Sequence, residues 1–293
     1  MRLGILGLPQ SGKTTLFNAL TRGTQPTGVA TGRMEVHTGV VDVPDPRVDR
    51  LSAMFKPKKT IYAKVTYADI AGLDGSAART GISGTLLNQL TQMDGFIHVV
   101  RCFENEQVAH PNGSIEPLRD VQMMDGEFLL NDLIAVERKL ERLTEERKKG
   151  AGREKGLVER EVVLFERLHA ALGEEKLLRD VEISAEEEKL LAGFGLLSRK
   201  PMLVVLNLSE GQPVPQFAYD HQHSRLVALQ ARLEMVIATL PPEEMAVFLE
   251  AYGLEEPSPN RMIRLSSDLH GLPSCFTVGP DEVRAWTSCC CES

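Results

Sequence analysis

One octapeptide near the start of the chain has the residue types and the spacing that bind phosphate groups. Residues 7–14 read Gly-Leu-Pro-Gln-Ser-Gly-Lys-Thr and fit the pattern G-x-x-x-x-G-K-[ST]. In such a loop the backbone N–H groups surround the phosphates, the lysine reaches the β and γ oxygens, and the final hydroxyl binds Mg²⁺. The pattern predicts a nucleoside triphosphate site whose contacts are Gly7, Pro9, Gln10, Ser11, Gly12, Lys13, Thr14 and Thr15.

A second motif, Asp69-Ile70-Ala71-Gly72, has the D-x-x-G spacing with which G proteins sense the γ-phosphate. Its carboxylate is suited to hold Mg²⁺ directly or through water. Gly72 can bring its N–H close to the phosphate because glycine has no Cβ. We expect Thr14 and Asp69 to share the metal, and we assign the catalytic roles to Lys13, Asp69 and Gly72.

The stretch Asn207-Leu208-Ser209-Glu210 is the candidate for reading the purine base. G proteins commonly carry Asn-Lys-x-Asp here, in which the aspartate accepts two hydrogen bonds from guanine; this chain lacks the lysine and has the longer glutamate. An amide can pair with adenine N6 and N7, so Asn207 favours ATP over GTP. Leu208, Glu210 and Gln230 complete the predicted contacts. The alternative is that Asn207 only caps a turn after a strand.

Both phosphate motifs follow apolar runs that have the length and composition of buried strands. Leu3–Leu8 precedes the phosphate loop and the helix-forming run Thr14–Arg22 follows it. Further strands are predicted at residues 35–43, 61–70, 96–102 and 202–208, the last after a break at Lys200-Pro201. Such strands suit a mostly parallel sheet with helices on both faces, an α/β fold of the P-loop NTPase type.

Residues 128–191 differ from this pattern because they are helical in type and highly charged. Two apolar stripes with a reversal at Gly150-Ala151-Gly152 predict an inserted α-helical coiled-coil hairpin, and Ser184 is the expected N-cap of the next helix. The predicted domains are a nucleotide-binding domain in two parts, 1–126 and 199–275, the insertion at 127–198, and a terminal segment at 276–293.

Composition narrows the function classes. Lys and Arg total 33 against 41 Asp and Glu, a net charge of -8, which argues against a whole-molecule electrostatic binder of nucleic acid. The sequence shows no secretion signal, no run near the roughly 18 apolar residues of a membrane span, and no disulfide framework. We expect a soluble, reduced, cytoplasmic protein without a membrane partner. For the run Cys289-Cys290-Cys291, a frayed tail is favoured over a metal, palmitoyl or redox role.

With these residues together, the chain resembles the YchF family of Obg-like ATPases. Beside the phosphate loop, the resemblance is carried by residues 38–41 with 44–47, 69–73, 98–105, 253–257 with 260–261, and 282–287, in the family's order. It implies a G domain, a coiled-coil insertion, a C-terminal TGS domain, ATP preferred over GTP, and association with ribosomes. It also implies a hydrophobic residue where many G proteins place a catalytic glutamine, and Leu73 stands there.

Several positions depart from the family pattern. Gln10 replaces an asparagine that could assist a monovalent cation, and Thr14 replaces a serine but still offers a hydroxyl to Mg²⁺. Arg33 stands at the first-switch threonine, with Thr31 nearby, and residues 74–81 replace a glycine-rich second switch. These changes predict slow or differently triggered hydrolysis. The sequence covers only the start of the expected TGS domain, at about residues 276–287.

Partner predictions rest on the tip of the hairpin. Residues 147–155 hold five basic residues and one acidic one, which suits contact with rRNA phosphates, and a solvated basic turn is the equal alternative. The function predicted is a weak Mg²⁺-dependent ATPase that acts as a ribosome-associated switch, with GTP left open as a second substrate. The alternatives are a nucleotide-gated scaffold with little hydrolysis and a GTP-specific GTPase. The oligomeric state is left open.

Overall fold

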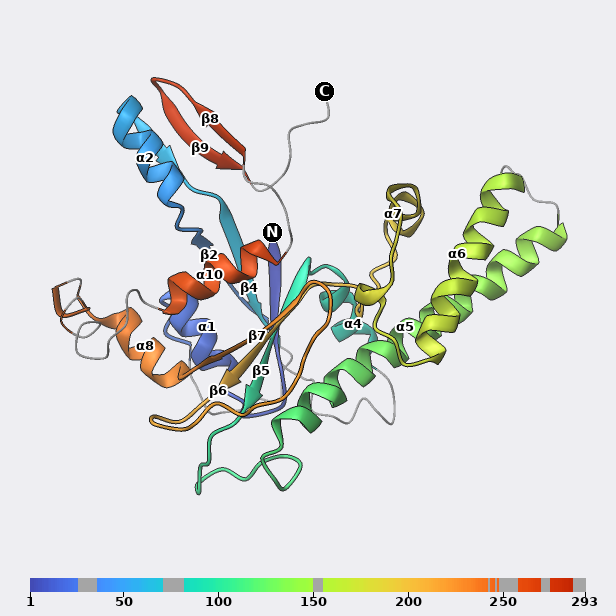
Figure 1. Ribbon diagram of the computed structural model, residues 1–293, viewed down its shortest axis with the longest axis horizontal. Coiled ribbons are helices and arrows are strands. Elements are labelled where there is room, and N and C mark those ends of the chain that lie inside the picture. The colour runs from blue at the N-terminus through green and yellow to red at the C-terminus, as the bar shows by residue number, and fades with distance from the viewer. Residues whose placement is uncertain are drawn as a thin grey trace.

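A six-stranded sheet forms the centre of the molecule (Figure 1). The structure, a computed structural model, describes residues 1–25, 36–70, 82–149, 155–241, 243–245, 247, 258–269 and 275–286. The strand order is β2-β4-β1-β5-β6-β7, and every pair is parallel except β2 with β4. This confirms the predicted mostly parallel sheet, whose strands are β1 (Arg2–Leu6), β2 (His37–Asp42), β4 (Lys64–Asp69), β5 (Gly95–Arg101), β6 (Met202–Asn207) and β7 (Ser224–Leu229).

Helices cover both faces of this sheet, also as predicted. On one face α1 (Lys13–Thr21), α8 (Ala231–Thr239) and α10 (Ser258–Asp268) pack against the strands through a core that includes Ile5, Leu16 and Met262. On the other face lie α4 (Gly84–Thr91) and the first turns of α5, where Phe128 meets Phe96 at a ring distance of 5.1 Å. Two-sided cover is what the fully buried strands β5 and β6 require.

The predicted hairpin is formed by α5 (Pro117–Lys149) and α6 (Lys155–Gly173). Its apolar stripes pack together in a core of its own, and Figure 1 shows it projecting from the central sheet. The segment then continues through a 3-10 turn, η1 (Leu178–Asp180), to α7 (Ala185–Leu191), which Ser184 caps in a capping box with Glu187. Helix α5 is continuous across residues 126 and 127, so the division into domains stays a prediction.

A second, three-stranded sheet was not predicted. It consists of β3 (Lys59–Ile61), β9 (Glu282–Trp286) and β8 (Cys275–Val278), and α2 (Pro46–Phe55) packs on it through Val48. The prediction of one strand over 61–70 is therefore wrong: Ile61 belongs to β3 and residues 64–69 to β4, in different sheets. Between them the Ala63 carbonyl accepts a hydrogen bond from Val43 N–H at 2.8 Å, outside either ladder.

Several predictions fall outside the described residues. They are the reversal at 150–152, the switch positions Thr31 and Arg33, the segment from Gly72 to Gly81 with Leu73, and the cysteine run 289–291. Among the helices that the structure describes, none has the length and apolar character needed to cross a membrane.

Candidate functional site

The phosphate loop occupies the turn between β1 and α1, at the carboxyl end of a central parallel strand. Gly7 and Gly12 have φ angles of +144° and +98°, which residues that carry a side chain rarely adopt. A Cβ on Gly7 would lie 2.3 Å from the Val99 carbonyl oxygen, and one on Gly12 would lie 2.3 Å from Asn207 Nδ2. Both glycines are thus required by close approach as well as by backbone conformation.

Lys13 begins helix α1 and its ammonium group is held above the loop. Nζ donates hydrogen bonds to the carbonyl oxygens of Gly7 and Leu8 at 2.9 and 2.8 Å. Burial lowers the pKa of Lys13 to about 8, and the negative charge of Asp69 opposes that shift. A buried cation whose hydrogen bonds go to neutral carbonyls is strongly stabilised by an anionic ligand. Phosphate oxygens would supply that negative charge.

Thr14 and Asp69 meet beside the lysine, as the two motifs together predicted. The Thr14 hydroxyl donates to Asp69 Oδ2 at 2.7 Å, and Asp69 is 6% exposed. The register of the neighbouring strands β1 and β4, with Ile5 opposite Asp69, fixes this approach. A hydroxyl and a carboxylate are the hard oxygen ligands that Mg²⁺ uses when phosphates and water complete its shell. The residues therefore fit Mg²⁺ together with a nucleotide. In the described part of the chain, His, Cys, Asp and Glu form no cluster of three that could hold a metal ion alone.

Two further residues of the loop are poised for a ligand. Ser11 is 1% exposed, and its Oγ has no hydrogen-bond partner among the residues that the structure describes. A buried hydroxyl without a partner is costly unless a ligand or water supplies one. Gln10 has a φ of 61°, a left-handed conformation that is strained for a glutamine. Of the remaining predicted contacts, Gln10 is exposed, while Pro9 and Thr15 are half-buried.

Asn207 connects the end of β6 to the phosphate loop, and the residue is 5% exposed. Its Nδ2 donates to the Ser11 carbonyl at 2.9 Å and its Oδ1 accepts from Ala231 N–H, at the start of α8, at 3.0 Å. Both ends of the amide therefore have partners in the protein. The geometry gives Asn207 a structural task, which is closer to the alternative of a capping residue than to a free purine-binding edge. Contact with the base stays a prediction.

The other predicted base contacts lie on the same edge of the sheet in different settings. The Leu208 side chain packs in the core and its N–H donates to the Leu229 carbonyl. Glu210 is exposed on the following turn, which Gln212 anchors through bonds with Ser209 N–H and the Cys102 carbonyl. Gln230 is the half-buried N-cap of α8 and its side chain makes no capping bond. Gln212 and Ala231 were missed because their partners are far away in sequence or are backbone groups.

Arg101 was also missed, although it ends the apolar strand β5 at this edge. Its guanidinium is buried and donates to the carbonyl oxygens of Phe103 and Val108 at 3.1 and 2.9 Å. The group also stacks on the Phe103 ring at 4.9 Å. An arginine directly after six apolar or neutral strand residues is a signal for such an anchor, here of the loop that follows β5.

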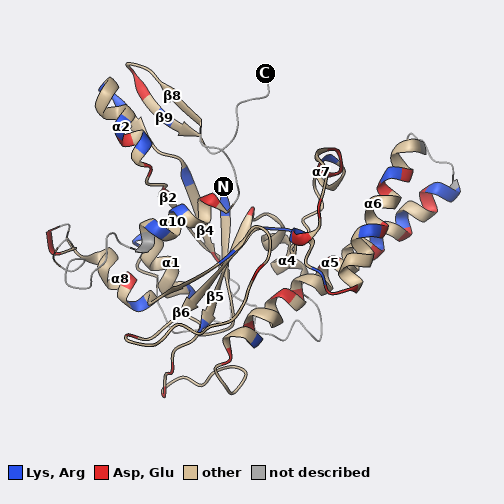
Figure 2. Ribbon diagram, in the orientation of Figure 1, with Lys and Arg blue, Asp and Glu red and all other residues tan. Residues whose placement is uncertain are grey.

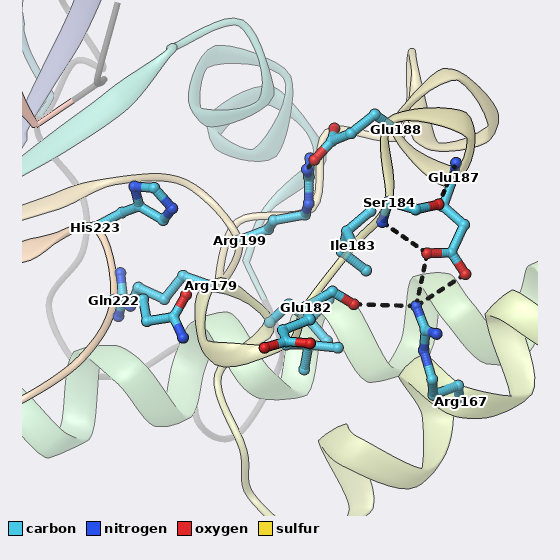
Figure 3. Close-up of a pocket in the computed structure, with 12 residues that line it drawn as sticks. Arg167, Arg179, Glu182, Ile183, Ser184, Glu187, Glu188, Arg199, Gln222 and His223 are labelled. Atoms are coloured by element: carbon cyan, nitrogen blue, oxygen red, sulfur yellow. Dashed lines mark hydrogen bonds and ion pairs between the residues drawn. The ribbon is translucent and has the colours of Figure 1, made fainter.

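A cavity of about 620 Å³ lies away from the phosphate loop, between the hairpin segment and the starts of β6 and β7 (Figure 3). Arg199 and His223 precede those strands, so the cavity is at the amino ends of strands whose carboxyl ends face the loop. Two ion pairs line it: Arg167 with Glu187 at 3.0 Å, and Arg199 with Glu188. These pairs hold α7 in place, and they supply none of the predicted chemistry.

Three comparisons with known proteins point the same way. A family model described as 50S ribosome-binding GTPase matches residues 2–139. The ribosome-binding ATPase YchF of Bacillus subtilis (strain 168) is 33% identical over 296 residues, which cover 97% of this chain and 80% of the relative. The protein of that name from Escherichia coli O157:H7 is 36% identical, with 98% and 80% covered. A solved structure of the Schizosaccharomyces pombe YchF GTPase shares the fold with a TM-score of 0.74 at 24% identity, over 98% of this chain and 80% of that one.

Proposed function

This chain belongs to the YchF family, and from that premise we propose that it binds ATP with Mg²⁺, hydrolyses it slowly, and acts in the cytoplasm as a ribosome-associated switch. The observation that carries the proposal is the 2.7 Å contact between Thr14 and Asp69, next to the desolvated Lys13. A hydroxyl, a carboxylate and a lysine in this arrangement match the demands of a Mg²⁺-bound triphosphate.

Each residue has a proposed task. The N–H groups of residues 9–15 would bind the α- and β-phosphates at the start of helix α1, where the helix dipole favours negative charge. Lys13 would leave the Gly7 and Leu8 carbonyls and donate to the β and γ oxygens. Thr14 and Asp69 would hold Mg²⁺, which supplies charge stabilisation to the phosphates when bound. Gly72 would offer its N–H to the γ-phosphate.

The preference for ATP rests on Glu210 more than on Asn207. A glutamate one methylene longer than the usual aspartate weakens the pair of hydrogen bonds that selects guanine, and the exposed position of Glu210 gives it no second anchor. Asn207 keeps one amide hydrogen and one lone pair beyond its two protein partners, so a contact with the purine is compatible with its structural task. GTP specificity is the competing proposal.

Slow hydrolysis is proposed because Leu73 stands where a glutamine would position the attacking water. The water would then depend on backbone groups, on the nucleotide or on the ribosome. The same feature supports a second function, a scaffold that binds ATP and barely turns it over. Single-turnover hydrolysis with and without ribosomes separates the two, since the scaffold predicts a rate no higher than that of Lys13→Ala.

Titration of the purified protein with fluorescent ATP and GTP, with and without Mg²⁺, tests the central proposal. We expect saturable binding that needs Mg²⁺ and Lys13 and is tighter for ATP. Clear preference for GTP would replace the ATPase with a GTPase, and no binding of either nucleotide would end the proposal.

Ribosome association is proposed from the names of the relatives, with the basic hairpin tip as its contact. Replacing Arg147, Lys148, Lys149, Arg153 and Lys155 with glutamine should weaken co-sedimentation with ribosomes and reduce its dependence on salt. Unchanged pelleting across a salt series would remove the tip from the proposal.

A further inference from the structure

The turn that joins α2 to β3 is a basic projection on an acidic protein. Between residues 46 and 64 the chain has six basic residues and one acidic residue, whereas the whole chain carries a net charge of -8. Figure 1 shows α2 and the β8–β9 hairpin extending together from the central sheet, and Figure 2 shows basic residues along α2. We name this surface the basic knuckle and define it by Arg50, Phe55, Lys56, Lys58 and Lys59.

The apolar stripe of α2 continues beyond the strands that cover it. Val48, Leu51 and Phe55 follow one another at helical spacing and share one face of the helix. Val48 is fully buried against Val283 and Ala285 of the small sheet, and Leu51 is partly buried there. Phe55, one turn further on, is 52% exposed. An aromatic ring is thus presented at the end of a helix whose earlier turns are covered.

Lys56 adds an independent observation. It ends α2 in the left-handed conformation, with φ 46° and ψ 54°, and its N–H donates to the Ser52 carbonyl. Glycine is the usual residue at such a helix end because a side chain is strained there. Strain that persists at an exposed position points to a task for the side chain itself. The Lys56 side chain is exposed, as is that of Phe55, the preceding residue.

The other cations of the knuckle differ in how far they are already neutralised. Lys58 pairs with Asp281 at 2.8 Å, in an exposed bridge. Arg50, Lys56 and Lys59 are exposed, and within the described part of the chain they have no ion-pair partner. Three positive charges without a described ion-pair partner therefore lie within five residues, in sequence, of one exposed aromatic ring.

We propose that the basic knuckle binds single-stranded RNA, with Phe55 stacked on an unpaired base and with Lys56, Lys59 and Arg50 on the flanking phosphates. A ring for the base and cations for the backbone form the combination that single-stranded nucleic acid requires, and unpaired RNA offers bases that are free to stack. An anionic membrane is the less favoured partner, because binding to a lipid surface requires a large apolar area. The knuckle offers only two exposed apolar side chains, Met54 and Phe55. The inference rests on the ribosome association proposed above and gives it a contact separate from the hairpin tip.

Fluorescence anisotropy with a labelled unstructured RNA of twelve nucleotides tests the knuckle on the full chain. The variant Arg50→Gln/Lys56→Gln/Lys59→Gln should weaken binding at low salt and reduce the slope of log affinity against log salt by about 2, because each phosphate contact on a single strand contributes about 0.7. The matched control, Lys176→Gln/Lys189→Gln/Arg225→Gln, makes the same charge change at three other exposed sites and should keep most of the affinity and of the slope.

Two single variants, Phe55→Ala and Lys56→Gly, and one rescue variant, Phe55→Trp, separate RNA contact from folding. Phe55→Ala should weaken binding roughly tenfold through lost stacking, and Phe55→Trp should restore it. Lys56→Gly relieves the left-handed strain, so its Tm should stay the same or rise while its RNA affinity falls. In these variants ATP affinity should equal that of the wild type, which shows an intact fold.

Equal RNA affinity in the triple variant and its control would overturn the proposal. So would binding of the wild type to phosphatidylserine vesicles with none to RNA, which would assign the knuckle to a membrane instead. Co-sedimentation of the wild type with ribosomes is measured in parallel. Absence of co-sedimentation would contradict the proposed ribosome association. RNA binding by the knuckle is judged separately, from the anisotropy measurement alone.

Discussion

Two regions on opposite edges of the central sheet bury charged side chains, and they treat those charges in opposite ways. At the phosphate loop, the Lys13 ammonium rests on two neutral carbonyls and the Ser11 hydroxyl has no partner among the described residues. At the base of the hairpin, the fully buried Arg179 pairs with Asp125 at 2.5 Å, and Tyr219 donates to the same carboxylate at 3.0 Å. Asp132 nearby accepts two backbone bonds and one hydroxyl bond.

The difference separates a binding site from a structural junction more clearly than burial does. A buried charge that the protein neutralises itself holds elements together, here α5, η1 and the loop before β7. A buried charge left on neutral groups raises the free energy of the unliganded site, and a ligand of opposite sign removes that cost. The hairpin junction should therefore respond to mutation through stability, and the phosphate loop through affinity.

The largest expected effect is on the stability of the junction. Arg179→Met leaves the Asp125 carboxylate buried without its counter-ion, which should lower the free energy of unfolding by about 3–5 kcal/mol. Urea denaturation followed by circular dichroism measures it. Arg142→Met, at an exposed site on α5, should change it by less than about 0.5 kcal/mol. A loss below 1 kcal/mol for Arg179→Met would mean that the buried pair does not hold the junction.

The converse change is made at the phosphate loop. Lys13→Ala removes a charged donor to the phosphates, and an interaction of about 3 kcal/mol corresponds to a loss of roughly 100-fold in ATP affinity. Stability without nucleotide should hold or improve slightly, because a desolvated cation is removed. Equilibrium binding of labelled ATP together with urea denaturation measures both quantities. A large loss of stability with unchanged affinity would reverse the contrast between the two regions.

Asn207 combines features of the two regions. It lies in the candidate nucleotide site, but both ends of its amide group are hydrogen-bonded to the protein, as in a structural junction. Asn207→Ala leaves the Ser11 carbonyl and the Ala231 N–H without their hydrogen-bond partner, which should lower the free energy of unfolding by about 2 kcal/mol. If its task is structural, ATP and GTP affinities should fall by the same factor. A selective loss of ATP affinity would instead place the amide on adenine. Asn88→Ala, at an exposed site on α4, is the matched control.

The charge on Lys13 should also make binding depend on pH. In the free protein its pKa is lowered to about 8, and bound phosphates raise the pKa because they favour the ammonium form. Binding therefore takes up a proton above pH 8, and ATP affinity should fall by up to about tenfold per pH unit there. Titrations between pH 7.5 and 9.5 at constant ionic strength measure the fall. Lys13→Arg, whose guanidinium stays charged, should bind more weakly but without this dependence.

The sequence predicted contacts between residues of the candidate site where the information is local, and missed contacts that depend on distant segments. Residues 7–14 contain their own strand-to-helix turn, and two motifs sufficed to place Thr14 against Asp69. Asn207 was predicted to contact the base, but its orientation depends on Ser11 and Ala231, which lie 196 and 24 residues away. The strand at 61–70 was wrongly joined, and α2 was not predicted. The partner of both β3 and α2 is β9, which lies more than 200 residues later.

The smallest predicted effect tests whether the phosphate loop also stores backbone strain. Gln10 is left-handed, and asparagine tolerates that conformation better than glutamine does. Gln10→Asn should therefore raise the free energy of unfolding by about 0.5–1 kcal/mol. Gln92→Asn is the matched control because Gln92, at the end of α4, has right-handed backbone angles and should gain nothing. If thermal and urea denaturation show the same gain in stability for both variants, the backbone strain is not at Gln10. The free-energy cost of the loop without its ligand then lies in Lys13 and Ser11 alone.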